Sequence, residues 1–204
     1  MTQPDELSVY HLPVEALAVM SLQDLLSQFP DRDALHIQLK LFKCTLSHDV
    51  ETFLHCHALR FKEAHKSRTY LVVPDSVRTS ESPTLNVLGY FTLALKHVPL
   101  GDDISNTRRK AMHGLFMPQG NVVVGYLLGQ LGKHDNCKVA LGSLLVDTAI
   151  GILQDQAQRA VGGRFVLVEC APHEKLLQFY EQNGFTVLQH DEEEQMIQLI
   201  RQLA

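Results

Sequence analysis

The sequence predicts an α/β fold in which helices cover the faces of an open sheet. The C-terminal half supplies the main observation, because apolar, β-rich runs alternate with helical stretches. The runs lie at residues 122–131, 164–170 and 185–188, and the helical stretches between them at 139–160 and 172–183. Strands and helices of such lengths, in alternation, are typical of a sheet flanked by helices. With 204 residues, 45% hydrophobic and 20% charged, the chain can bury a substantial core.

The N-terminal half is predicted to begin with a helix. Residues 13–29 carry a partial apolar face at helical spacing. Residues 34–42 alternate apolar and polar side chains, which predicts a first strand with one exposed face. Residues 49–66 repeat apolar side chains at helical spacing, and Ser47 or Asp49 could cap that helix.

The middle of the chain is predicted to contain two further strands, at residues 69–73 and 86–97, with a polar loop at 76–83 between them. A long connection, residues 99–121, follows and includes a short helical stretch. Connections of this length in compact domains are often functional. The pattern of residues 196–203 is ambiguous.

Composition indicates a cytoplasmic protein. The N-terminus lacks the basic and apolar regions of a signal peptide, and no apolar run approaches the roughly 20 residues of a membrane span. The four cysteines have no C-x-x-C spacing, so reduced thiols are expected. The net charge of -5 argues against a general nucleic-acid binder, although a local basic face could exist.

The turn between the strand at 122–131 and the following helix is a candidate anion site. Amides at a helix N-terminus lack intrahelical partners and lie at the positive end of the helix dipole. Gly142 would allow close approach, and Lys138 adds positive charge. An ordinary strand-to-helix connection is the alternative, since neither G-x-G-x-x-G nor G-x-x-x-x-G-K-[ST] occurs in the chain.

The segment Leu-Gln-Phe-Tyr-Glu-Gln-Asn-Gly-Phe at residues 177–185 resembles a motif of the GNAT superfamily of acyl-CoA N-acyltransferases. The segment at 89–95 is similar to the third strand of that family. Phe42-Lys43-Cys44, Phe53-Leu54, Ala58 and residues 68–71 are similar to its branch of toxins that acetylate aminoacyl-tRNA.

The resemblance covers residues 42–188 and implies a GNAT-like fold, with a mixed sheet of about six or seven strands. We expect a single domain over residues 1–204. Residues 34–204 would form its core, and residues 1–33 a helical appendage or an oligomer contact, so a homodimer is one arrangement to consider.

The resemblance also implies that acetyl-CoA binds between the fourth and fifth strands. Its pantetheine arm would pair with the strand end, and its pyrophosphate would meet the following turn. The residues concerned are Leu131, Gly132, Lys133, Lys138, Val139, Ala140, Leu141, Gly142 and Ser143. The superfamily's loop usually has the pattern Gln/Arg-x-x-Gly-x-Gly/Ala. Aligned on Gly142, this chain has Cys137 and Ala140 at the first two fixed positions.

Tyr180 is the candidate catalytic residue. The resemblance implies that its hydroxyl protonates the departing CoA thiolate, and a phenol with a pKa near 10 carries the required proton at neutral pH. A backbone N–H near Leu131 would polarise the thioester carbonyl. No general base stands out. Glu169 could serve, or it could be an ordinary carboxylate on a strand.

Two other groups of residues suggest sites but fit them poorly. His48, His55, Cys56 and His57 resemble a metal-ligand cluster, yet three adjacent side chains on a helix diverge too widely to share one ion, so no metal is expected. Cys170 with His173 could suggest a thiol nucleophile, but a cysteine ending an apolar strand is usually inert.

The sequence therefore favours an N-acetyltransferase that moves an acetyl group directly from acetyl-CoA to a primary amine. A toxin acetylating aminoacyl-tRNA, held in check by an antitoxin, and a degenerate binding module are the alternatives. Charged tRNA as acceptor is also favoured by a candidate basic face. That face would comprise Lys62, Lys66, Arg68, Arg108, Arg109 and Lys110.

Overall fold

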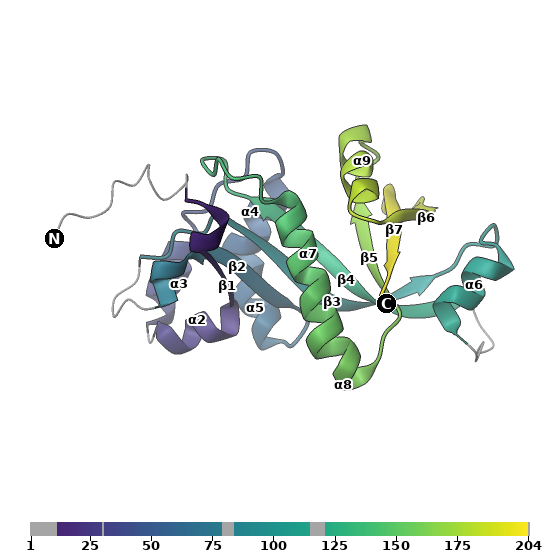
Figure 1. Ribbon diagram of the computed structural model, residues 1–204, viewed down its shortest axis with the longest axis horizontal. Coiled ribbons are helices and arrows are strands. Elements are labelled where there is room, and N and C mark those ends of the chain that lie inside the picture. The colour runs from purple at the N-terminus through teal and green to yellow at the C-terminus, as the bar shows by residue number, and fades with distance from the viewer. Residues whose placement is uncertain (1–11, 30, 79–83, 115–120, 204) are drawn as a thin grey trace. The chain divides into compact units, whose positions relative to one another are not determined.

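The computed structural model describes residues 12–29, 31–78, 84–114 and 121–203 (Figure 1). Seven strands form one mixed sheet in the order β1-β2-β3-β4-β5-β7-β6. The chain divides into two compact units. The first unit comprises Met1–Leu93 and Gln130–Leu145, and the second Ala94–Gly129 and Val146–Ala204. Strands β3 and β4 and helix α7 contribute residues to both units.

In the first unit, β1, β2 and the start of β3 pair antiparallel. Strand β1 lies beside β2, with Leu17 opposite Pro74, and β2 lies beside β3, with Arg68 opposite Leu93. The elements in chain order are η1 (Val14–Ala16), β1 (Leu17–Ser21), α2 (Leu22–Gln28), α3 (Arg32–Leu39), α4 (His48–Thr52), η2 (Phe53–His57), α5 (Ala58–Glu63), β2 (Arg68–Pro74), η3 (Asp75–Arg78) and the start of β3 (Gly89–Pro99).

Two sequence predictions for this unit were wrong. Residues 13–29 are helical only from Leu22, because residues 17–21 form β1 and Ser21 caps α2 by accepting a hydrogen bond from the Asp24 amide. The expected helical appendage, residues 1–33, therefore includes a strand of the sheet. Residues 34–42 are not a strand, since most of them belong to α3, where Asp31 accepts from two amides of the first turn.

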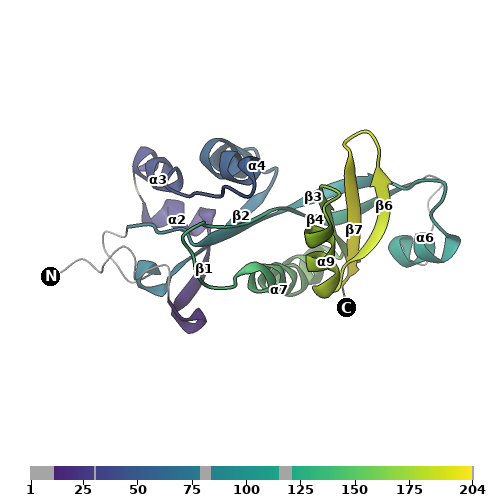
Figure 2. The same ribbon diagram turned by 90° about the horizontal axis from the view of Figure 1, so that it is seen from above.

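The helix predicted over residues 49–66 is confirmed as the continuous run α4, η2 and α5, of which η2 is a π-helical segment. Ser47 is its N-cap. Helices α2, α3 and α4 lie on the same side of β1 and β2 (Figure 2). Their apolar side chains share one core with those strands. This core includes Met20, Leu25, Leu35, Leu39, Leu54, Leu71 and Tyr90.

The second unit combines parallel and antiparallel strand pairs. Strand β4 pairs with β5 in parallel, and β7 pairs antiparallel with both β5 and β6. The hairpin of β6 and β7 is visible in both views (Figures 1 and 2). The elements are α6 (Asn106–His113), β4 (Val122–Lys133), α7 (Gly142–Ile152), η4 (Leu153–Gln158, also π-helical), α8 (Arg159–Val161), β5 (Phe165–Cys170), α9 (Glu174–Gln182), β6 (Thr186–Asp191) and β7 (Met196–Gln202).

These elements confirm the strands and helices predicted for the C-terminal half, and with them the mixed α/β fold. The core of this unit gathers apolar side chains from α6 and five strands, including Val98, Met112, Val123, Phe165, Leu167, Leu188 and Ile200. The long connection after β3 contains α6, as the sequence predicted. The prediction of a polar loop at 76–83 falls partly on η3, and residues 79–83 lie outside the described part of the chain.

All four cysteines are free thiols, and of these only Cys56 is exposed. Within residues 12–29, 31–78, 84–114 and 121–203, no helix has the length and apolar character needed to cross a membrane.

Candidate active site

The candidate cofactor residues all lie in the first unit, around the turn that joins β4 to α7. Strand β4 ends at Lys133, and α7 begins at Gly142. The Leu145 amide donates to the Leu141 carbonyl at 2.9 Å, which closes the first turn of the helix. The amides of this first turn have no partner within the helix, as expected of an anion-binding helix start. Lys138, Ala140 and Ser143 are exposed here, and Leu141 is buried.

The end of β4 requires glycine because neighbouring groups leave no room for a side chain. A Cβ on Gly132 would overlap Cγ1 of Val50. On the adjacent strand, a Cβ on Gly89 would lie 3.0 Å from the Gly132 carbonyl oxygen and 3.1 Å from Cδ1 of Leu141. Two glycines thus let the strand ends and the start of α7 approach closely. Close packing fixes the position of the backbone at Leu131, Gly132 and Lys133.

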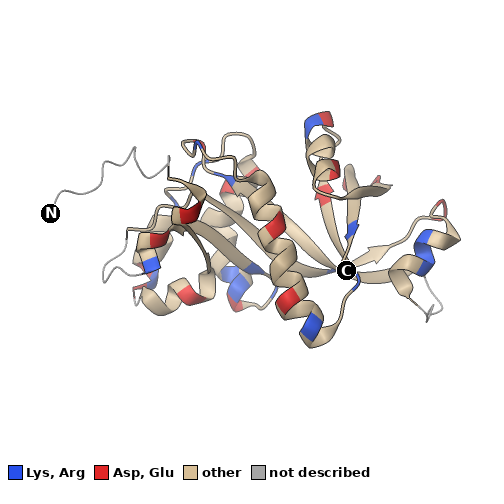
Figure 3. Ribbon diagram, viewed as in Figure 1, with Lys and Arg blue, Asp and Glu red and all other residues tan. Residues whose placement is uncertain are grey.

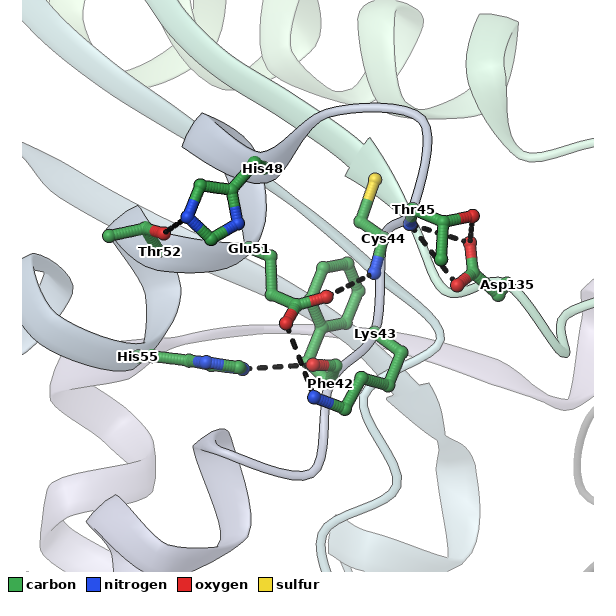
Figure 4. A network of polar contacts seen from close by, with 9 residues as sticks. All are labelled: Phe42, Lys43, Cys44, Thr45, His48, Glu51, Thr52, His55 and Asp135. Carbon is green, nitrogen blue, oxygen red and sulfur yellow. Dashed lines mark hydrogen bonds and ion pairs between the residues drawn. The ribbon is translucent and has the colours of Figure 1, made fainter.

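A loop that joins α3 to α4 is held beside this strand end by two carboxylates (Figure 4). Glu51 accepts a hydrogen bond from the Cys44 amide at 2.9 Å and forms a 3.2 Å ion pair with Lys43. Asp135, two residues beyond β4, accepts from the Thr45 amide at 3.0 Å. The Asp135 amide in turn donates to the Lys43 carbonyl at 2.9 Å. The loop is therefore tied to both α4 and the β4 end.

Electrostatics in this loop follow from its contacts. The Cys44 amide, and then the Lys43 ammonium, hold the pKa of Glu51 below its usual value, so this carboxylate stays ionised. Burial raises the pKa of the Cys44 thiol, which therefore stays protonated at neutral pH. Burial also lowers the pKa of His134, whose Nδ1 accepts from the Asn136 amide at 3.0 Å. A neutral imidazole with Nδ1 as acceptor fits that bond.

Tyr180 lies on α9 in the second unit and is half-buried. Its ring packs edge-on against Phe179 and Phe185, with centroid distances of 5.1 and 5.6 Å. Burial, with a smaller contribution from Cys170, raises the pKa of Tyr180 to about 12. The phenol is therefore protonated at neutral pH, as a proton donor must be. Phe179, the preceding residue of α9, is half-buried as well.

Glu169 has partners that make it a poor general base. One carboxylate oxygen lies 2.5 Å from Nζ of Lys96, and the other accepts from Nε2 of Gln198 at 2.8 Å. Its position in β5 places it on the same face of the sheet as the core residues Phe165 and Leu167. Both oxygens are engaged with donors, so the structure favours a carboxylate that stabilises the sheet.

The histidines and cysteines singled out in the sequence have structural contacts. His55 bonds through Nε2 to the Phe42 carbonyl at 2.8 Å, and His48 to Oγ1 of Thr52 at 3.3 Å. Among the described residues, no group of three or more acidic, histidine or cysteine side chains could hold a metal. Burial raises the pKa of the Cys170 thiol, while His173 caps α9. This thiol is not activated as a nucleophile.

The basic residues named as a candidate face differ in their roles. Arg109 is buried, and its guanidinium donates to the carbonyls of Ile104 and Gly101 at 2.9 and 2.5 Å and to the Asn121 side chain at 2.9 Å. It stabilises the long connection and cannot contact a ligand. Lys62, Lys66 and Arg68 belong to the first unit, and Arg108 and Lys110 to the second. Helix α6 carries several basic side chains (Figure 3).

Sequence reasoning missed the two carboxylates that hold the loop, Glu51 and Asp135. Neither lies in a recognisable motif, because each bonds to a backbone amide whose position depends on the fold. Arg201, on β7, was also missed, although its guanidinium donates to the Asn183 carbonyl at the end of α9 at 2.9 Å. A single arginine in a closing strand gives no signal in the sequence.

Comparisons with known proteins connect this architecture to a group of bacterial toxins. No protein-family model matches the sequence, and no curated protein sequence matches it significantly. Solved structures do match it. AtaT complexed with acetyl-methionyl-tRNAfMet is 24% identical with a TM-score of 0.65, covering 89% of this chain and 93% of its own.

Two further structures agree. AtaT bound to acetyl-CoA and the C-terminus of the antitoxin AtaR is 23% identical with a TM-score of 0.62, covering 92% of this chain and 94% of its own. KacT is 22% identical with a TM-score of 0.64, over 90% of this chain and 94% of its own. Both were solved as tyrosine-to-phenylalanine mutants. The likeness establishes the fold: this chain has the GNAT fold of these toxins.

Proposed function

We propose that this protein is an acetyl-CoA-dependent N-acetyltransferase whose acceptor is the α-amine of an aminoacyl-tRNA. The observation that carries the proposal is Tyr180, a half-buried phenol on α9 with its pKa raised to about 12. The similar structures add support, since they include AtaT with acetyl-CoA and AtaT with acetyl-methionyl-tRNAfMet.

Acetyl-CoA would be bound mainly by backbone groups of the first unit. The amides at the start of α7 would receive the pyrophosphate, with Lys138 adding charge, and the turn at Val139, Ala140, Leu141, Gly142 and Ser143 would surround it. The edge of β4 at Leu131, Gly132 and Lys133 would pair with the pantetheine arm as a neighbouring strand does. Because amides bind through the backbone, Cys137 and Ala140 are compatible with this role.

The reaction would be a direct transfer with no covalent enzyme intermediate. The acceptor nitrogen attacks the thioester carbonyl, whose developing charge is stabilised by a backbone N–H near Leu131. The C–S bond then breaks, the nitrogen loses one proton and the sulfur gains one. Tyr180 supplies the sulfur's proton and recovers one from solvent. An α-amine with a pKa of about 7.7–8.0 is partly neutral at cellular pH, so it needs little help from a base.

The test is an acetylation assay with the purified full-length chain. Labelled acetyl-CoA is offered with a pool of charged tRNA, with uncharged tRNA, and with small primary amines. The proposal expects label on charged tRNA only. Mild base, which cleaves the ester between amino acid and tRNA, should release this label as an N-acetylamino acid in which the acetyl amide is intact. Label on small amines alone would indicate a stand-alone N-acetyltransferase, and calorimetry showing no acetyl-CoA binding at millimolar ligand would leave a degenerate binding module.

Replacement of Gly142 by valine tests the cofactor site separately. A β-branched side chain at the helix start would keep the pyrophosphate from the amides, so the KM for acetyl-CoA should rise about tenfold or more. The same change at Gly151, where a Cβ meets nothing within 4 Å, is the matched control on the same helix. Equal KM values for the two variants would refute this placement of the pyrophosphate.

A toxin of this kind would require a neutralising partner in the cell, and the AtaR complex supports an antitoxin in that role. Induced expression of the chain alone should then arrest growth, and Tyr180→Phe should relieve the arrest. Harmless expression of a folded, acetyl-CoA-binding protein would contradict the toxin proposal.

A further inference from the structure

A concave hollow of about 360 Å³ lies in the second unit, at the ends of β6 and β7. Its lining includes two arginines, Arg108 from α6 and Arg201 from β7, with Thr186 and Gln202. Within residues 12–29, 31–78, 84–114 and 121–203, no carboxylate side chain is among the lining residues. The other lining residues, Ala111, Gly184 and Ile200, are uncharged, so the described lining is positively charged in a chain whose net charge is -5.

A third guanidinium lies next to this hollow. Nε of Arg164 donates to the carbonyl of Ala111, a lining residue, at 3.0 Å. The Arg164 carbonyl accepts from the Leu203 amide at 2.9 Å, directly after the lining residue Gln202. Three arginines from separate parts of the sequence are thus gathered at one place by the fold.

Each guanidinium is anchored by the scaffold while keeping donors for a ligand. Nη2 of Arg108 donates to the Val187 carbonyl at 2.6 Å and to Oγ1 of Thr186 at 3.3 Å. Nη1 of Arg201 donates to the Asn183 carbonyl at 2.9 Å. A guanidinium has five N–H donors, so these bonds use only part of its capacity. Anchored side chains lose little entropy on binding.

Carboxylates lie near two of these arginines. Arg108 also borders a second hollow, whose lining includes Asp103, Asp191, Glu192 and Glu193. Asp147 lies 3.9 Å from Nη1 of Arg201, at the limit of an ion pair, and its side chain is 69% exposed. Ion pairs of this kind in solvent contribute little. Arg108 and Arg201 line the same hollow with like charges, which a bound anion would offset.

We propose that this hollow binds a phosphate group, namely a backbone phosphate of the RNA that carries the acceptor amino acid. Guanidinium groups match phosphate oxygens in geometry and charge. The proposal rests on the function proposed above. The hollow lies in the same unit as Tyr180, and Arg201 bonds to the end of the helix that carries it. A phosphate held here would position the acceptor strand with respect to α9.

The experiment measures the KM for aminoacyl-tRNA, the KM for acetyl-CoA, and the binding of uncharged tRNA at several salt concentrations. The variants are Arg108→Ala, Arg164→Ala and Arg201→Ala, with Arg201→Lys retaining the charge. Arg159→Ala is the matched control, since this arginine is an exposed residue of α8 that forms an ion pair with the exposed Asp155. Thermal melts establish that each variant is folded.

We expect each alanine variant to raise the KM for aminoacyl-tRNA and the Kd for uncharged tRNA about tenfold. The slope of log K against log salt should fall by about one per arginine removed. Arg201→Lys should recover part of the loss, and Arg159→Ala should change neither constant. The KM for acetyl-CoA should stay within about twofold of wild type.

Three outcomes separate this proposal from the proposed function. If wild type acetylates charged tRNA but the alanine variants bind tRNA as well as Arg159→Ala does, the phosphate site is refuted and the function stands. If the KM for acetyl-CoA rises instead, the phosphate belongs to the cofactor, and the RNA proposal is overturned. If wild type acetylates no tRNA yet binds it with an arginine-dependent salt slope, the function fails and the phosphate site stands.

Discussion

The candidate machinery differs in kind between the two units. In the first unit, the groups assigned to the cofactor are backbone amides and strand edges, positioned by packing around Gly132 and by the loop that Glu51 and Asp135 hold. In the second unit, the group assigned to catalysis is one side chain, Tyr180 on α9. A backbone site tolerates changes of side chain if the fold is preserved, whereas a side-chain site depends on one functional group. Substitutions that disturb the fold should therefore impair the cofactor site of the first unit. Loss of one functional group should impair the catalytic site of the second unit.

The largest effect should come from the hydroxyl of Tyr180. Tyr180→Phe removes only the proton donor, so kcat should fall by ~10²–10⁴-fold with acetyl-CoA affinity nearly unchanged. Stopped assays for kcat and calorimetry for affinity measure the two effects. Phe179→Leu, on the same helix, is the control for packing. A Tyr180→Phe enzyme with wild-type kcat would reduce Tyr180 to a core aromatic.

The next largest effect should be structural and confined to the first unit. Gly132→Ala places a methyl group on Cγ1 of Val50, and such overpacking costs about 1–3 kcal/mol of folding free energy. Chemical denaturation measures the loss. Replacing Val50 by alanine in the same chain should restore part of it, because the methyl group then has room. If the losses of folding free energy caused by the two substitutions simply add, the close approach of Gly132 to Val50 would be contradicted.

A smaller effect should follow from releasing the loop. Glu51→Ala removes the acceptor of the Cys44 amide and should cost about 1 kcal/mol, the usual net contribution of one hydrogen bond. Glu51→Gln keeps an acceptor oxygen and should cost less. Since the pKa of Glu51 is lowered in the folded state, its contribution is present above the unfolded value of 4.5 and is lost as pH falls through the lower folded value. The wild type and Glu51→Ala should therefore converge in stability in acid.

The smallest effect should be a pH dependence due to His134. Burial lowers the pKa of His134 in the folded chain below the value of 6.5 expected when unfolded. Below pH 6.5 the unfolded chain therefore binds a proton that the folded chain does not, and stability falls towards acid pH by at most about 1.4 kcal/mol per pH unit. Thermal melts of wild type and His134→Gln between pH 7.5 and 5.5 measure this. If the melting temperatures of the two proteins change with pH in parallel, His134 contributes nothing to the pH dependence of stability.

The same contrast explains what the sequence could predict. The motif containing Tyr180 was visible because a side-chain function fixes residue types, and the strands and helices after residue 122 have strong periodicity. The loop held by Glu51 and Asp135 could not be predicted from the sequence, because carboxylates that bind backbone amides follow no sequence motif. The prediction of a strand at residues 34–42 was wrong because Leu35 and Leu39 fit both an alternating strand and one face of a helix. The cap at Asp31 favours the helix.

Strand β1 was missed for a related reason. Its five residues are too few to establish a period, and Leu17, Met20 and Leu25 also fit helical spacing. Only pairing with β2, which is distant in sequence, makes this segment a strand. Long-range partners of this kind override local propensity.

The two π-helical segments, η2 and η4, have a consequence for how chains of this fold are aligned. A π turn contains one residue more than an α turn, so each segment is a one-residue insertion absorbed within a helix. Deleting one residue from Phe53–His57 or Leu153–Gln158 would restore α-helical bonding and leave both helix ends available for the same neighbours. When a related chain is one residue shorter, the gap in the sequence alignment therefore belongs inside one of these helices. An alignment that allows gaps only in loops would misplace it.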